Sequence, residues 1–206
     1  AEDRAEIQAL YRELTEGKPQ GRLLVTCRPE QTGLTGIKEY PLRGLLRSDS
    51  LHLLAVIQDK KGSPSYPREE IESLLEQLED HPLSIELVAP HLKDLPPKDI
   101  REQYAVLLDR FSNPDAKEDR NKGLRASLEF SSQRLSPAAQ AALPWLAWFE
   151  GGVFELFFLD VCGMKPEDWE PLRAELVDTA LIQVESEWQI DDRPYLRFHP
   201  TLRYAA

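Results

Sequence analysis

Apolar residues recur at helical spacing over most of the chain beyond residue 67, and this periodicity constrains the fold more than any other feature. One stretch places apolar residues on one face of a helix, at Ile71, Leu74, Leu75 and Leu78. A second stretch repeats the pattern at Ile100, Tyr104, Leu107, Leu108 and Phe111. Between them, HPLSIELVAPHL is expected to form a third helix that starts at Pro82, because proline is favoured in a first turn. We therefore predict a helical bundle domain over residues 63–118.

A second helical block follows the polar stretch SNPDAKEDRNKG. Its helices are expected near residues 124–132, 137–149, 153–161 and 167–180. Two strand-like segments, LIQVESEWQI and YLRFH, flank the turn DDRP and predict a hairpin. Because helices followed by one hairpin are typical of a winged helix, we predict a winged-helix domain over residues 119–206.

The first part of the chain has a different pattern. A helix is expected up to about Glu16, and the apolar run Leu23–Val25 in GRLLVTCRPE lacks alternation, which indicates a strand covered on both faces of a parallel sheet. IKEYPL could form a short edge strand, and the apolar residues at 51–57 are expected to form a helix. The predicted fold class is therefore mostly α with a small α/β remnant over residues 1–62.

Composition narrows the classes of partner. Of the 206 residues, 41% are hydrophobic, enough for buried cores, and the formal net charge of −11 disfavours attraction to phosphate backbones. Nucleic acid is therefore not expected as a partner. No stretch approaches the roughly 18 apolar residues of a membrane span, so we expect no membrane partner. Cys27 and Cys162 have no metal-binding spacing, which fits a reducing, cytoplasmic location.

Two further patterns argue against nucleic-acid binding. The segment from about Pro166 to Ala180 carries five acidic residues against Arg173 alone, so it would repel DNA phosphates. The aromatic residues of the preceding helices stand at helical spacings and are expected in the core rather than on a base-stacking surface: Trp145, Trp148, Phe149, Phe154, Phe157 and Phe158.

The chain contains no GxxxxGK[ST], GxGxxG, HExxH or GxSxG motif, so we predict no catalytic residue and no metal site. Three residues remain as candidates for ligand binding. Arg28 follows the apolar run, where an arginine could bind a phosphate through two donors or only close the strand. Pro82 could present a flat face to a base or only start its helix. His199 could hold a phosphate together with helix N-terminal amides, or act in capping or packing.

Four segments, in this order, resemble the STAND class of signalling ATPases, which includes the NB-ARC subgroup. GRLLVTCRPE looks like the sensor strand of that class, and EYPLRGLLRSDSLHLLAVI is similar to the segment after it. LLEQLEDHPLSIELVAPHL resembles the GxP segment of the helical domain. LRFHPTLRYAA resembles the end of the family's winged helix, where the histidine of a motif often written MHD lies. In their order and spacing, the four segments span essentially all 206 residues.

The resemblance implies roles for the three candidates. Arg28 would sense the terminal phosphate, Pro82 would pack by the adenine, and His199 would contact the β-phosphate of ADP and hold the closed state. Two positions depart from the family pattern, because Asp80 replaces a glycine and Pro200 replaces an aspartate. These departures weaken the expected ADP lock.

The family's phosphate loop and its Mg²⁺-binding strand would precede residue 1, so the resemblance implies a regulatory portion of an ADP/ATP switch. Residues 1–62 would be the C-terminal part of the α/β NTPase core. ADP or ATP would bind in the intact parent, whereas this chain alone is expected neither to bind nucleotide tightly nor to hydrolyse ATP. The expected partners are the missing N-terminal part of the core, a second copy, or a downstream repeat domain.

Two other functions are compatible with the same residues. The chain could be a nucleotide-independent protein-interaction module whose winged helix makes the contacts. It could also be part of a STAND-type transcription regulator in which another segment binds DNA.

Overall fold

The computed structural model describes residues 2–15, 24, 26, 37, 38, 40, 42–112, 122–199 and 202. It divides into two units, residues 1–43 and 44–206. In the first unit the expected helix is present as α1 (Glu2–Thr15), and its described residues contain no strand. The strand predicted at Leu23–Val25 lies largely outside the described residues, so the parallel sheet stays a prediction.

The second unit is mostly helical. Its first half contains α2 (Arg47–Lys61), α3 (Arg68–Gln77), α4 (Pro82–Val88), the 3-10 turn η1 (Ala89–Lys93) and α5 (Pro97–Arg110). The helices predicted from the apolar spacing are confirmed, and their apolar faces form one core that includes Leu74, Ile85 and Ile100. Helix α2 contributes Leu54 to this core. The domain limits at residues 62 and 118 stay predictions.

The second half combines helices with a small antiparallel sheet. Its elements are α6 (Lys122–Ser132), α7 (Pro137–Leu146), β1 (Gly152–Phe154), α8 (Glu155–Cys162), α9 (Pro166–Asp178), β2 (Gln183–Ile190) and β3 (Arg193–Arg197). The predicted hairpin is confirmed, and its turn residues Asp191 and Asp192 both have positive φ, as tight hairpins require. The three strands are arranged in the order β1-β3-β2.

Strand β1 was not predicted, since we expected a helix to begin at Val153. Instead Val153 pairs with Leu196 of β3, and the helix begins two residues later. Gly152 permits this pairing, because a Cβ atom there would lie 2.5 Å from the Tyr195 hydroxyl. The strand thus depends on contacts with residues more than forty positions away in sequence, which local periodicity does not reveal.

The predicted burial of the aromatic residues is wrong in part. Phe158 is fully buried, but Trp145, Trp148 and Phe157 are exposed. The inward face of α7 is already filled by Ala139, Ala142, Leu143 and Leu146. Residues at the helical positions between these necessarily point outward.

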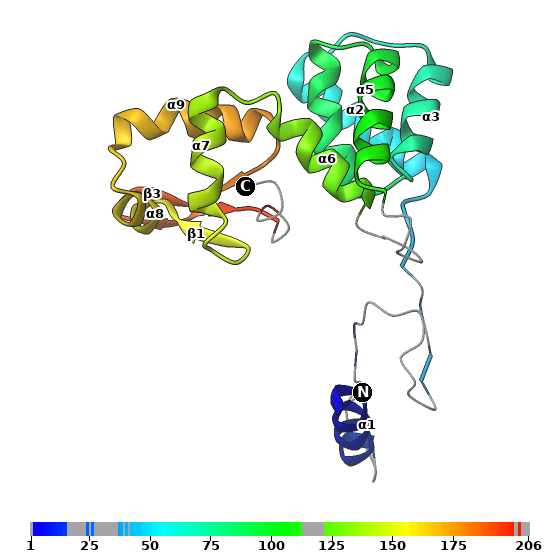
Figure 1. The fold of residues 1–206 in the computed structure, drawn as a ribbon, viewed down its shortest axis with the longest axis vertical. Coiled ribbons are helices and arrows are strands. Elements are labelled where there is room, and N and C mark those ends of the chain that lie inside the picture. The colour runs from blue at the N-terminus through cyan, green and yellow to red at the C-terminus, as the bar shows by residue number, and fades with distance from the viewer. Residues whose placement is uncertain are drawn as a thin grey trace. The chain divides into compact units, whose positions relative to one another are not determined.

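Helix α6 joins the two halves of the unit (Figure 1). Ala126 and Phe130 are buried in the core of the first half, whereas Leu128 is buried in the core of the second. The hydroxyl of Ser131 lies fully buried at the junction, 2.9 Å from the Thr179 carbonyl oxygen and 3.0 Å from His91 Nε2. It can donate to the carbonyl while it accepts from a protonated Nε2, so η1, α6 and the end of α9 are linked by one side chain.

A buried charge organises the second half. Glu155 has no exposed surface, and its Oε1 accepts from Trp169 Nε1 at 2.6 Å and from Arg173 at 2.7 Å. Its Oε2 lies 3.4 Å from Arg193 of β3. The carboxylate therefore links the start of α8 to both α9 and the sheet. Among the described residues, no helix is long and apolar enough to cross a membrane.

Stability should depend on pH through His91. Burial, followed by the nearby charges of Arg134 and Lys61, lowers the pKa of His91 from 6.5 to about 4. Below pH 6.5 the unfolded chain therefore binds a proton at this histidine that the folded chain does not bind. As a result, the free energy of unfolding decreases as the pH falls toward 4. Between pH 6.5 and about pH 5, the free energy of unfolding measured in urea should fall by about 2 kcal/mol more in the wild type than in His91→Gln. The exposed control His52→Gln should keep the wild-type slope, and equal slopes for His91→Gln and wild type would contradict the buried neutral imidazole.

Removing the charge of Glu155 should destabilise the second half. Glu155→Gln keeps the shape but weakens the bonds to two arginines, so we expect a loss of about 2 kcal/mol in the free energy of unfolding, measured in urea at pH 7. The control is Glu187→Gln, at an exposed position of β2. A loss no greater than that of the control would rule out a stabilising role for the buried carboxylate.

Candidate functional site

A cleft of about 510 Å³ lies between helix α4 and the β2–β3 hairpin. Helices α4 and α6 form one side of it through apolar side chains and a carboxylate: Leu83, Glu86, Leu87 and Leu128. The hairpin and the residues after it supply Trp188, Tyr195, Arg197, Phe198 and His199. The cleft thus brings together segments that are more than one hundred residues apart in sequence.

Pro82 is the first residue of α4, and its side chain is exposed. The preceding residue, His81, caps the helix, because its Nδ1 accepts a hydrogen bond from the Ser84 amide at 3.3 Å. Sequence analysis named Pro82 but not His81, although a residue before a first-turn proline is the expected place for a cap. The structure therefore assigns a local role to His81 and leaves the exposed ring of Pro82 beside the cleft residue Leu83.

His199 follows β3 and lies at the cleft, next to the start of α4. Burial lowers the pKa of His199, and the neighbouring His81 lowers it further. Burial also lowers the pKa of His81, while Glu79 opposes that shift. Both shifts therefore favour the neutral form of the imidazole.

Among the described residues that line the cleft, the other charged side chains are those of Glu86, Glu150 and Arg197. Burial raises the pKa of Glu86, which lines the α4 side. On the other side, Arg197 forms an ion pair with Glu185 at 2.9 Å. Trp188 and Tyr195 lie against each other with ring centroids 5.7 Å apart and an interplanar angle of 53°, so they present two inclined aromatic faces. The cleft is therefore suited to a ligand with one flat apolar part and a polar end near His199.

Arg28, the third predicted ligand-binding residue, lies outside the described residues, as does Pro200. Sequence reasoning missed Glu86, Trp188 and Tyr195, whose positions in a helix and in strands gave no sign that they would face one another. Among the described residues, no group of three or more His, Cys, Asp or Glu side chains could hold a metal ion.

The turn before α4 explains one departure from the family pattern. Asp80, where the STAND class has a glycine, has a φ of 51°, in the left-handed region that favours glycine. Its carboxylate pairs with Arg47 at 3.0 Å, and its carbonyl accepts from the Leu45 amide at 2.8 Å. Asp80 therefore keeps the turn that a glycine would allow and adds contacts to the segment that enters α2.

Comparison with known proteins adds no assignment: the chain matches no protein-family model and no curated protein.

The coupling between the two histidines can be measured directly. In His81→Gln the imidazole charge next to His199 is removed, so the pKa of His199 should rise toward its usual value in an NMR titration. His52→Gln, an exposed histidine of α2, should leave the pKa of His199 unchanged. An unchanged pKa in His81→Gln would show that the start of α4 and the end of β3 are not neighbours in solution.

Proposed function

We propose that the chain is the regulatory portion of a nucleotide-dependent switch of the STAND type, with a helical bundle over residues 63–118 and a winged helix over residues 119–206. One observation carries the proposal. The two described residues that the family resemblance assigns to nucleotide binding, Pro82 and His199, belong to the segments that meet at one cleft. The resemblance assigns both residues to one bound nucleotide and therefore requires their segments to lie close together.

The cleft has the properties that a switch of this kind needs. Its volume of about 510 Å³ lies within the range of small-molecule sites, roughly 300–1,000 Å³. It is formed by two separate elements, helix α4 and the hairpin. A ligand that contacts both elements stabilises the arrangement in which they lie together, and its release removes that bias.

The charges indicate how a nucleotide would lie. A neutral imidazole at His199 can donate a hydrogen bond to a phosphate oxygen, whereas Glu86 on the opposite side would repel it. We therefore place the phosphates at the His199 end and the base against the apolar side that continues from Pro82 through Leu83. In the family that the chain resembles, the cationic contacts come from a phosphate loop, a motif that this sequence does not contain, and from the sensor arginine that Arg28 would represent. Among the described residues that line the cleft, Arg197 is the one arginine or lysine, and it is paired with Glu185, so this chain alone should bind nucleotide weakly.

The alternatives differ in their support. The transcription regulator in which another segment binds DNA stays an untested alternative. Helix α9 itself is disfavoured as the DNA-binding element, since the exposed residues Glu167, Asp168 and Glu170 are all acidic. A protein-interaction module has one observation in its favour, the exposed tryptophans of α7, and this function is compatible with a switch.

The proposal is tested by titrating the isotope-labelled chain with ADP and following amide shifts by NMR. We expect shifts at Leu83, Glu86 and His199, with a dissociation constant on the order of 1 mM, and no ATP hydrolysis. In His199→Ala the shifts at Leu83 and Glu86 should weaken severalfold, while His52→Ala should behave as the wild type. Shifts that persist unchanged in His199→Ala, or that occur only outside the cleft, would refute the assignment.

A further inference from the structure

The exposed face of α7 carries no charge. One exposed residue of α7, Gln140, is polar and donates to the Ser132 and Leu135 carbonyl oxygens. The other five exposed residues of the helix are apolar: Pro137, Ala138, Ala141, Pro144 and Trp145. Trp148 continues the same face in the turn after the helix and is 78% exposed. The exposed faces of helices in globular proteins normally carry charged side chains, so an apolar face of this length indicates a binding surface. We call these six residues the α7 face.

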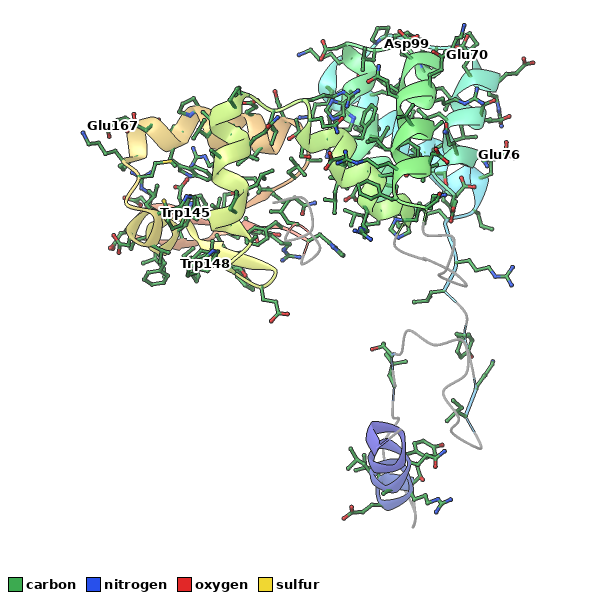
Figure 2. All side chains as sticks on the ribbon, in the orientation of Figure 1. Glu70, Glu76, Asp99, Trp145, Trp148 and Glu167 are labelled. Atoms are coloured by element: carbon green, nitrogen blue, oxygen red, sulfur yellow. The ribbon has the colours of Figure 1, made fainter. Side chains whose placement is uncertain are left out.

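The two tryptophans form a preassembled unit. Their rings stack with centroids 6.3 Å apart and an interplanar angle of 30°, and Figure 2 shows both beside α7, well apart from Glu167 at the start of α9. Large rigid aromatic side chains lose little conformational entropy when they are covered and commonly dominate the binding energy of interfaces. Trp145 and Trp148 are therefore the expected anchors of a contact.

The charge pattern around this face identifies the kind of occupant. From Ser136 to Met164 the sequence contains no lysine, arginine or histidine. The exposed charged residues of this segment are Glu150, just after the tryptophans, and Asp160 on α8, which contacts α7. An anionic membrane surface or a nucleic acid would be repelled, because both are attracted by clustered basic residues.

A second copy of this chain is also a poor occupant. A symmetric dimer would place the same acidic residues of both copies across one interface, and each copy carries a formal net charge of −11. A partner that combines an apolar stripe with basic residues has the complementary charge. We propose that the α7 face binds a basic amphipathic helix of a partner protein.

The shape of the surface fits a helix. The small residues Ala138 and Ala141 leave room at one end for large apolar side chains of the partner, whereas the tryptophans project at the other end. Helices pack by inserting the ridges of one into the grooves of the other, and a surface with such alternation supplies both. None of the six residues lines the cleft at His199, whereas Glu150 does. The charge comparison for this surface therefore uses Asp160, which does not line the cleft.

The test uses the full 206-residue chain and a displayed library of random peptides of about 16 residues, four to five helical turns. Peptides that bind the wild type should be net positive, with apolar residues at helical spacing. Their affinity should fall about tenfold or more in Trp148→Ser and in Trp145→Ser, and remain unchanged in Val106→Ser, an exposed apolar position of α5. Circular dichroism checks that each variant keeps its helix content.

A charge reversal provides a second, matched comparison. Asp160→Lys should weaken the selected peptides severalfold, whereas Asp99→Lys on α5 should not. The proposal is overturned if no selected peptide distinguishes the wild type from Trp148→Ser, or if the peptides that do so are net acidic. It is also overturned if sedimentation shows a dimer that Trp148→Ser dissociates, since the occupant would then be a second copy.

Discussion

The two faces of α6 set the geometry of the larger unit. Its apolar residues alternate between two cores, and Ser131 occupies the point where three elements meet without solvent. A buried hydroxyl costs free energy unless it is hydrogen-bonded, so the positions of His91 and the Thr179 carbonyl are linked to that of α6. Apolar packing alone would tolerate a slide of one half against the other, whereas these directional bonds favour a single arrangement.

The cleft is a consequence of that arrangement. Helix α4 contacts α6, and the Leu87 carbonyl of α4 lies 3.3 Å from the same Ser131 hydroxyl. The hairpin is held from the other direction, because the buried carboxylate of Glu155 connects Arg193 of β3 to α8 and α9. The contacts through Ser131 position α4, and those through Glu155 position the hairpin. His81 and His199 are neighbours because both sets of contacts lead to the cleft. A ligand at the cleft could therefore act on both halves, since a change at either wall is transmitted through few bonds.

The binding surface of α7 lies outside this network. The inward residues of α7 complete the second core, so the outward residues are not needed for packing within the chain. Stability does not require tryptophan at an exposed position, and two stacked tryptophans among acidic neighbours fit binding better than packing. The chain thus separates a site formed between elements from a surface formed on one helix, and either can be altered without the other.

The sequence alone determined where most helices and the hairpin lie, because apolar spacing, first-turn prolines and the Asp191–Asp192 turn are local signals. An ordered resemblance also named Pro82 and His199 as candidate ligand-binding residues, which stays a prediction, but it did not name the residues around them. The strand β1, the exposure of Trp148 and the meeting of His81 with His199 were decided by tertiary structure. Each depends on which other part of the chain lies opposite. Apolar spacing shows on which face of an element a side chain lies, but it does not show whether another part of the chain covers that face.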